Sequence, residues 1–189
     1  MMRITIRANP KLNLDLAVYP KNNGETHHKI DSKLQEVEGE IYDGVTLELT
    51  DKISETRVLY TDGRVYENDN ALRAAQSVLK HSESRKGLDI TIRKGIPEGV
   101  GLGGSSADAA AICKGYALLT GKDFANDFLF KLGADVPFQY FGGCAEVSGF
   151  GEIVKPVCSD GNNFVLLIYS GAKVATKEAF DLFDRRGAE

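Results

Sequence analysis

Residues 96–111 read Ile-Pro-Glu-Gly-Val-Gly-Leu-Gly-Gly-Ser-Ser-Ala-Asp-Ala-Ala-Ala, a glycine-rich run that passes directly into an alanine-rich one. Glycine has no Cβ atom, so successive backbone N–H groups can face a ligand at close range. The alanines predict a helix, whose N-terminus would add unpaired N–H donors and the positive end of the helix dipole. This combination predicts an anion site, and phosphate is its usual occupant.

The composition narrows the class of protein around this site. The chain has 189 residues, of which 42% are hydrophobic and 26% charged, and its net charge is −4. An acidic chain is poorly suited to nucleic acid, and no apolar run is long enough to cross a membrane. Three widely spaced cysteines, at positions 113, 144 and 158, indicate free thiols rather than a disulfide framework. We therefore expect a cytoplasmic protein that binds neither nucleic acid nor a membrane.

The hydrophobic pattern away from the glycine run predicts a mixed order of strands and helices. Strands are expected at 2–7, 12–18, 41–51, 56–60, 88–93, 144–148 and 164–169. Helices are expected at 69–81, 105–120, 123–132 and 175–184. Asn68 or Asp69 is expected to cap the first of these helices. Strands dominate before the glycine run and helices after it, which favours an α+β (mixed α/β) fold.

Three known phosphate loops compete for the glycine run. A Walker A loop requires a lysine before its Ser or Thr, and no lysine lies between Gly95 and Ser106. The dinucleotide fingerprint matches at Gly99, Gly101 and Gly104, but a helical pattern follows the predicted helix where that fold requires a strand. A glycine-rich turn without a ligand remains a further alternative.

The third loop pattern, Pro-x-x-x-Gly-Leu-Gly-(Gly)-Ser-Ser-Ala, fits the run throughout. This pattern resembles the phosphate loop of the GHMP small-molecule kinases. The resemblance implies an ATP site made of Pro97, Gly99, Gly101, Leu102, Gly103, Gly104, Ser105, Ser106 and Ala107. Ser105 and Ser106 are expected to cap the helix, and Ser106 could also bind Mg²⁺. Asp108 is expected to face solvent, because it would repel phosphate if it pointed inward.

Other segments resemble one branch of that family, the 4-diphosphocytidyl-2-C-methyl-D-erythritol kinases of isoprenoid precursor biosynthesis. The matching stretches are Ala-Asn-Pro-Lys-Leu-Asn-Leu at 8–14, Asn-Asp-Asn-Ala-Leu-Arg-Ala-Ala at 68–75, Leu-Gly-Ala-Asp-Val-Pro-Phe at 132–138 and the glycine-rich run at 142–152. The resemblance implies a GHMP-kinase N-terminal domain, of the type seen in ribosomal protein S5 domain 2, over residues 1–160. Residues 161–189 would then begin a C-terminal domain.

The same resemblance implies roles for single residues. Asp135 would be the catalytic base and Lys11 would neutralise charge near the γ-phosphoryl group of ATP. The cytidine-diphosphate-linked polyol substrate would be bound by Asn13, His27, His28 and Phe180. His27 replaces the tyrosine of the family pattern and offers a smaller ring for stacking on cytosine. The implied reaction transfers the γ-phosphoryl group, with Mg²⁺, to the 2-hydroxyl of 4-diphosphocytidyl-2-C-methyl-D-erythritol.

Several alternatives remain open at this point. Asp135 could be a turn or cap residue, Lys11 an outward-facing lysine and His28 a surface histidine. Members of the family are longer and carry a third glycine-rich motif, so the resemblance implies a chain that lacks most of the C-terminal domain. Such a chain could bind nucleotide without transferring phosphate. A GHMP kinase for another polyol, such as a sugar or a mevalonate-like acid, is the third possibility.

Overall fold

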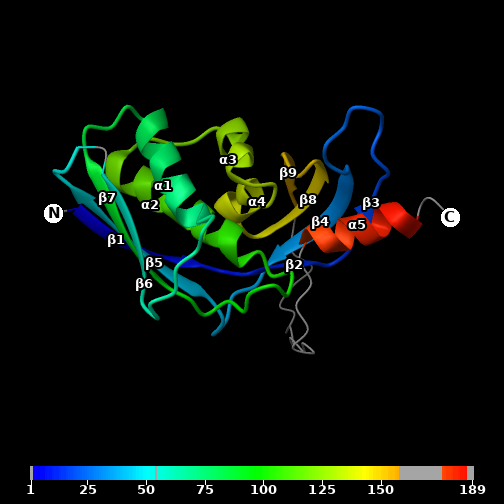
Figure 1. The fold of residues 1–189 in the computed structure, drawn as a ribbon, viewed down its shortest axis with the longest axis horizontal. Helices are drawn as coiled ribbons and strands as arrows, with labels where there is room; N and C mark the ends of the chain where they lie inside the picture. The colour runs from blue at the N-terminus through cyan, green and yellow to red at the C-terminus, as the bar shows by residue number, and fades with distance from the viewer. Residues whose placement is uncertain (1, 54, 158–175, 187–189) are drawn as a thin grey trace.

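The computed structural model describes residues 2–53, 55–157 and 176–186, which form two β-sheets and five helices (Figure 1). The strands of the first sheet are, in spatial order, β1 (Met2–Ala8), β5 (Asp43–Thr50), β7 (Gly87–Arg93) and β6 (Thr56–Tyr60). The second sheet contains β2 (Lys11–Asn13), β4 (Ile30–Glu36), β8 (Cys144–Gly149) and β9 (Ile153–Pro156), and β3 (Ala17–Val18) pairs with β4. The helices are α1 (Asn70–His81), α2 (Gly104–Thr120), α3 (Asn126–Leu132), α4 (Val136–Phe141) and α5 (Thr176–Arg186).

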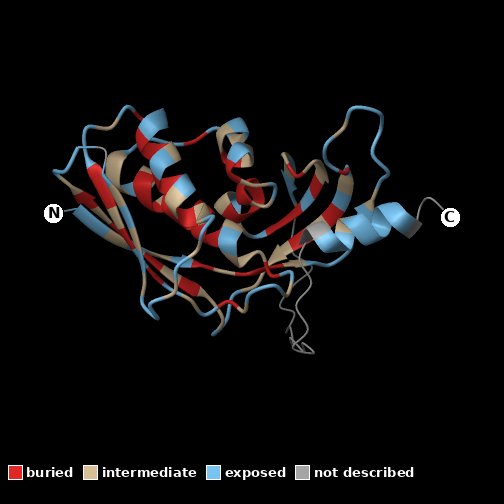
Figure 2. Cartoon of the chain, in the orientation of Figure 1, coloured by how far each residue is buried: buried red, intermediate tan, exposed pale blue. Residues whose placement is uncertain are grey.

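The main hydrophobic core lies between the first sheet and the helices α1 and α2, which cover one face of it (Figures 1 and 2). Alternate residues of β5 and β7 enter this core, because successive side chains of a strand point to opposite faces. Leu47 and Ile92 are both fully buried there. All pairs in this sheet are antiparallel except β6 with β7. The glycine loop leaves β7 and enters α2, so both of its ends are fixed in this core.

Helix α2 lies unusually close to the sheet at Gly115. A Cβ atom on this residue would lie 2.6 Å from Cδ1 of Leu47 and 3.2 Å from Cγ1 of Ile6. Leu47 is fully buried and has little room to move. A glycine is therefore required here for the close approach that fixes the depth of α2 and, with it, the position of the loop.

The second sheet has a smaller core, made by Leu34, Phe138, Ala145 and Val147. Helix α4 joins the two cores, since Val136 packs in the first and Phe138 in the second. Both side chains are almost completely excluded from solvent. This double anchoring fixes α4, and the residue just before it is Asp135.

The predicted α+β order is confirmed. Strands β1, β5, β6, β7 and β8 and helices α1 and α2 lie within a few residues of the predicted ranges. Asp69 caps α1 as predicted, with Oδ1 accepting hydrogen bonds from the backbone N–H groups of Ala71 (2.8 Å) and Leu72 (3.2 Å). The predicted helix at 175–184 corresponds to α5. The predicted strand at 164–169 and the boundary between residues 160 and 161 lie outside the described residues.

Other local predictions were wrong. The single strand expected at 12–18 is divided into β2 and β3, because the Asp15 carboxylate accepts a hydrogen bond from the Lys33 backbone N–H (2.5 Å) and replaces regular strand pairing. Strand β4 was missed because only Ile30 and Leu34 of its seven residues are apolar. Helix α4 and strand β9 were also missed, and α3 begins three residues later than predicted, at Asn126.

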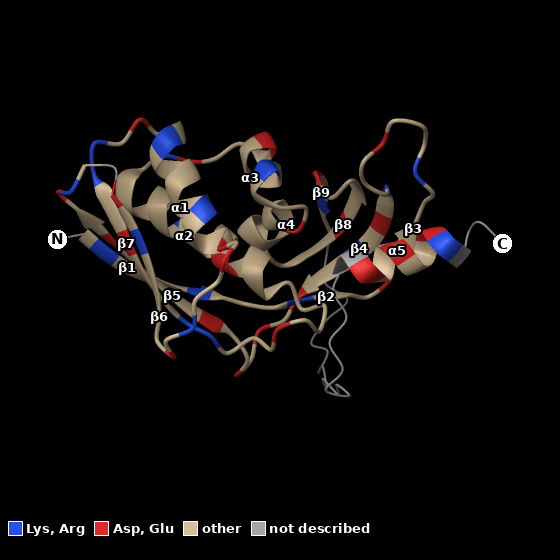
Figure 3. Ribbon diagram, in the orientation of Figure 1, with Lys and Arg blue, Asp and Glu red and all other residues tan. Residues whose placement is uncertain are grey.

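Acidic and basic residues occur together on many of the described elements, including α5 (Figure 3). None of the helices within the described ranges is long and apolar enough to cross a membrane.

Candidate active site

The loop between β7 and α2 adopts a backbone conformation that glycine permits. Gly99, Gly101 and Gly103 have φ values of 72°, 80° and 71°, in the left-handed region that other residues rarely occupy. A Cβ atom on Gly101 would meet nothing within 4 Å, so the loop has open space on this side. The loop can therefore admit a ligand close to its backbone.

The start of α2 differs from the prediction. The helix begins at Gly104, and Gly103 in its left-handed conformation occupies the cap position with no side-chain hydrogen bond. The expectation that Ser105 and Ser106 cap the helix was wrong, because a glycine in this conformation turns the chain into the helix one residue earlier. Ser105 instead accepts a 3.4 Å hydrogen bond from Nδ2 of Asn70, at the start of α1. No side chain caps the first turn of α2, which leaves its N–H groups available to an anion.

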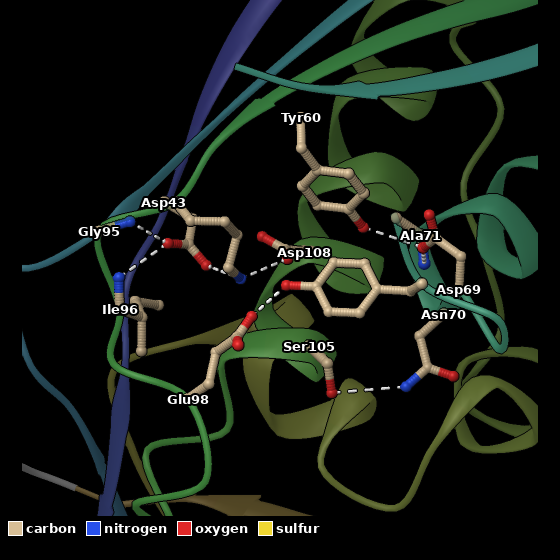
Figure 4. Close-up of polar contacts among 12 residues, drawn as sticks. Asp43, Tyr60, Asp69, Asn70, Ala71, Gly95, Ile96, Glu98, Ser105 and Asp108 are labelled. Carbon is tan, nitrogen blue, oxygen red and sulfur yellow. Dashed lines mark hydrogen bonds and ion pairs between the residues drawn. The ribbon is translucent and has the colours of Figure 1, made fainter. Parts of the chain in front are cut away.

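A buried charged cluster lies against the entry of the loop (Figure 4). Asp43 accepts hydrogen bonds from the backbone N–H groups of Gly95 (2.6 Å) and Ile96 (2.8 Å) through Oδ1. Lys94 donates to Oδ2 of Asp43 and, at 2.7 Å, to Oδ2 of Asp108. The three charged side chains are at most 6% exposed. The cluster therefore ties β5, the loop entry and α2 together.

The prediction that Asp108 faces solvent was wrong. Its position on the inner side of α2 places the carboxyl group beside Lys94, and its Oδ1 atom is buried without a hydrogen-bond partner. Burial raises the pKa of Asp108 to about 8, the positive charge of Lys94 opposes this, and the charge of Asp43 adds to it. Burial alone would lower the pKa of Lys94, but the two carboxyl groups raise it. Two carboxyl groups thus share one cation.

This cluster predicts a pH dependence of stability. The pKa of Asp108 is about 8 in the folded protein, because of burial, and returns to its ordinary value of 3.8 when the chain unfolds. Between these two pH values the folded state binds more protons than the unfolded state, so the stability of the fold falls as the pH rises. The free energy of unfolding is therefore not reduced by Asp108 below about pH 4, and it decreases as the pH rises toward 8. Between pH 5 and pH 7 the loss should reach up to about 3 kcal/mol. Urea unfolding at both pH values should show it.

The control for this prediction is Asp108→Asn, which keeps the shape of the protonated acid and cannot ionise. Its unfolding free energy should fall less between pH 5 and pH 7 than that of the wild type. An equal fall in the two proteins would show that Asp108 does not carry the effect.

Lys11, Asn13 and Asp135 lie together beside the loop. The Lys11 ammonium donates to Oδ1 of Asn13 (2.5 Å) and lies 3.6 Å from Oδ2 of Asp135. The Lys11 backbone N–H donates to the carbonyl of Leu102 (3.0 Å), which joins β2 to the loop. A Cβ atom on Gly103 would lie 3.0 Å from Cγ of Lys11. Lys11 is only 7% exposed, so it is not an outward-facing surface lysine.

Asp135 occupies the cap position of α4 but does not act as a cap. Its side chain makes no hydrogen bond to the helix, and its backbone carbonyl accepts the bond from the N–H of Gln139 (3.0 Å). Its side chain is 34% exposed and beside Lys11. The carboxylate is therefore accessible to a ligand and held near a cation.

A second group of predicted residues meets at α5. His28 is buried, and its Nδ1 atom donates to the carbonyl of Tyr19 (2.9 Å). The rings of His28 and Phe180 stack with centroids 5.0 Å apart and planes inclined by 9°. Asp184 lies 3.1 Å from Nε2 of His28 and 2.7 Å from the Lys21 ammonium. The structure thus joins His28 and Phe180 from distant parts of the sequence.

His27 does not join this group. It is exposed, and its Nδ1 atom forms a 2.8 Å hydrogen bond with the Thr26 hydroxyl. Among the described residues, no hydrogen bond or ion pair joins His28 to Lys11, so the two groups are separate.

A further set of residues at the loop was missed by sequence reasoning. Glu98 accepts hydrogen bonds from Arg64 (2.8 Å) and from the Tyr66 hydroxyl. The Tyr66 ring packs edge-on against Tyr60, whose hydroxyl donates to Asp69 (2.9 Å) (Figure 4). These contacts hold the outer side of the loop against the start of α1. Only the charge of Glu98 within the glycine run could have suggested them.

Comparisons with known proteins agree with this geometry. Residues 69–146 match the model of the GHMP kinases N terminal domain. The chain is 34% identical over 190 residues to a 4-diphosphocytidyl-2-C-methyl-D-erythritol kinase of Desulfotalea psychrophila. The alignment covers 96% of this chain and 62% of that protein. It is 32% identical over 191 residues to the enzyme of that name from Alkaliphilus metalliredigens, in an alignment that covers 97% of this chain and 64% of the relative. The chain thus spans less than two thirds of the length of these relatives.

Solved structures give the same result for the fold. A crystal structure of 4-(cytidine 5'-diphospho)-2C-methyl-D-erythritol kinase superposes with a TM-score of 0.66 at 30% identity, over 82% of this chain and 55% of that one. Mevalonate pyrophosphate decarboxylase from Streptococcus pyogenes superposes with a TM-score of 0.67 at 14% identity, over 99% of this chain and 65% of that one, which supports the fold alone. The matched residues 69–146 include the glycine loop, α1, α2 and Asp135. Over residues 69–146 the chain therefore matches the N-terminal domain of the GHMP kinases, and its fold agrees with that match.

Proposed function

We propose that this chain is an ATP-dependent small-molecule kinase that phosphorylates the 2-hydroxyl of 4-diphosphocytidyl-2-C-methyl-D-erythritol. One observation carries the proposal: an open glycine loop at a helix N-terminus lies directly beside the pair formed by Lys11 and Asp135. Phosphoryl transfer needs a phosphate cradle, a cation and a proton acceptor in one place. The proposed acceptor is the one for which the similar proteins are named.

The loop would hold the nucleotide. The triphosphate of ATP would lie against the backbone of residues 97–107, where glycines permit close approach and the uncapped turn of α2 offers N–H donors. Asp43 fixes the loop entry by bonding two of its backbone N–H groups. The loop is therefore held in shape before ATP binds, and preorganised donors stabilise charge most effectively.

The chemistry would take place beside Lys11. The Asp135 carboxylate would accept the proton of the acceptor hydroxyl as the hydroxyl oxygen attacks the γ-phosphorus, and ADP would leave. The Lys11 ammonium, 3.6 Å from that carboxylate, would offset the negative charge of the transferred group. Asn13 also accepts a hydrogen bond from this ammonium. This arrangement gives each of the three residues a distinct task.

Mg²⁺ fits this site as an ion that is coordinated mainly by the phosphates of the nucleotide. No three acidic, histidine or cysteine side chains gather to hold a metal within the ranges described. Mg²⁺ commonly keeps several waters and binds substrate phosphates with one or two protein oxygens. Ser106, at the start of α2 and freed from capping, is the proposed protein ligand. When bound, Mg²⁺ would neutralise charge on the phosphates.

The acceptor would be recognised through its cytosine by His28 and Phe180. The two rings stack directly on each other, so a third ring could enter only if they separate. Phe180 lies on α5, which Asp184 holds to Lys21 and His28. Base binding would then require α5 to shift. His27 would contribute from the surface beside His28, and Asn13 would face the polyol.

An ADP-release assay of this chain with a set of acceptors tests the proposal. ADP should appear with ATP, Mg²⁺ and the cytidine-diphosphate-linked methylerythritol, and should not appear with the unlinked polyol or with mevalonate. ADP release with mevalonate or a sugar instead would assign a different acceptor. ATP binding without ADP release for any alcohol would mean that the chain binds nucleotide only.

A further inference from the structure

Gln139 is a buried polar residue whose side chain has no partner. It is 6% exposed, and its Nε2 atom is inaccessible to solvent and makes no hydrogen bond to any described residue. A buried amide donor without an acceptor destabilises a fold, and such groups are rare in native proteins. An unpaired donor at this position therefore calls for an acceptor beyond the described residues, and a bound ligand is one that the site could supply.

The position of Gln139 is fixed by the helix that carries it. It lies one turn after Asp135 in α4, on the same face of the helix, and its backbone N–H donates to the Asp135 carbonyl (3.0 Å). Its neighbours in the helix are held in the two hydrophobic cores through Val136 and Phe138. The direction of the amide is thus set by the packing of α4.

The amide points at the phosphate loop. A Cβ atom on Gly103 would lie 3.2 Å from Nε2 of Gln139 and 3.0 Å and 3.2 Å from Cγ and Cε of Lys11. The donor therefore lies between the loop, the Lys11 side chain and the helix that begins after Asp135. Lys11 is a flexible side chain and Gly103 has no side chain, so a shift of Lys11 could open a path from the loop to this donor.

We propose that Gln139 binds a phosphoryl oxygen in this site, by donating an amide hydrogen bond from Nε2 once Lys11 has turned toward the phosphate. The inference rests on the proposed kinase function. Phosphoryl oxygens are acceptors only, and a neutral amide adds a donor without adding charge to a site that already holds Lys11 and Asp135. The oxygen could belong to the nucleotide or to the diphosphate of the acceptor.

The variant that tests this is Gln139→Met, which keeps an unbranched side chain of similar length and removes the donor. Without ligand, its thermal midpoint should rise by roughly 2–6 °C, because a buried unpaired amide is lost. The dissociation constant for ATP should rise by about 10-fold, because a hydrogen bond to a charged oxygen is lost. Stability and affinity should therefore change in opposite directions.

Gln35→Met is the matched control. Its Nε2 atom donates to the carbonyls of Glu36 (2.9 Å) and Gly143 (3.3 Å), away from the loop. This change should lower the thermal midpoint and leave ATP affinity unchanged. If Gln139→Met does not fold, Gln139→Leu replaces it, since it also removes the donor without adding a charge and should weaken ATP binding by about 10-fold.

Calorimetry with ATP and with CDP distinguishes the outcomes. Weaker binding of ATP alone assigns the oxygen to the nucleotide, and weaker binding of CDP alone assigns it to the acceptor. Unchanged binding of both ligands overturns the inference while the kinase proposal stands. If the wild type binds neither ATP nor CDP, the kinase proposal fails and this inference falls with it.

Discussion

Replacing Asp135 with asparagine should lower the rate of acceptor-dependent ADP release by about 10²–10⁴-fold, which is the usual contribution of a general base. Asparagine has the same shape but cannot accept the proton of the attacking hydroxyl. ATP affinity should remain close to that of the wild type, because the phosphates are held by the loop and α2 rather than by this carboxylate. Single-turnover measurements at saturating ATP separate the two effects.

Asp127→Asn is the control for that result. Asp127 undergoes the same chemical change, on the exposed side of the neighbouring helix α3, and lies outside the group around Lys11. Its rate should stay within about twofold of the wild type, since surface changes of this kind have small effects. If Asp135→Asn kept more than a tenth of the wild-type rate, another group would be the proton acceptor.

Replacing Lys94 with methionine should lower the free energy of unfolding by about 3–5 kcal/mol, because it leaves two buried carboxyl groups without a cation. Asp43 and Asp108 would then face each other with side chains that are 0% and 4% exposed. The loss should be larger at pH 8 than at pH 5, because burial raises the pKa of Asp108 and its protonation relieves the repulsion. Urea unfolding at the two pH values measures this.

Two further variants make the Lys94 result specific. At pH 8 and above, where Asp108 loses its proton, adding Asp108→Asn to Lys94→Met should restore part of the lost stability, since one of the two unpaired carboxylates disappears. Lys86→Met removes an exposed lysine that pairs with Asp51, and it should leave the urea midpoint almost unchanged. An equal decrease in the free energy of unfolding for Lys86→Met and Lys94→Met would contradict the claim that burial makes the loss of Lys94 costly.

The local features of this protein could be predicted from its sequence, because local patterns determine them. The alternation of β5 and β7 and the capped start of α1 at Asp69 follow from residues close together in the chain. The phosphate loop could be predicted for the same reason, since its glycines and the alanines of α2 are contiguous. The start of α2 was misplaced by one residue, because the left-handed conformation of Gly103 determines it and not the chemistry of the two serines.

Long-range contacts could not be predicted in this way. Asp43 is far from Lys94 and Asp108 in sequence, and nothing near Asp43 indicates that a loop N–H will bond to it. Asp108 was assigned to solvent because a local argument about repulsion ignored the buried Lys94, which directly follows β7. Nothing in the sequence around Gln139 indicated a function, because its buried amide donor without a partner is seen only in the folded structure.

The two cores explain why the loop and Asp135 come together. Gly115 allows α2 to approach the first sheet closely, and α4 joins that core to the second one through Val136 and Phe138. The loop precedes α2 and Asp135 precedes α4, so the packing of these two helices sets the geometry of the site. The second core is small, so large-to-small changes at Phe138 should disturb the site together with the fold.

The central claim is that the loop between β7 and α2 holds the phosphates of a nucleotide. Titrating this chain with ATP and with AMP in a calorimeter tests it most directly, because the two ligands share base, ribose and first phosphate. We expect the dissociation constant for ATP to be at least about 10-fold lower, since each hydrogen bond to a charged phosphate oxygen contributes roughly 1.5–3 kcal/mol. Equal dissociation constants, or no binding of either nucleotide, would contradict the claim.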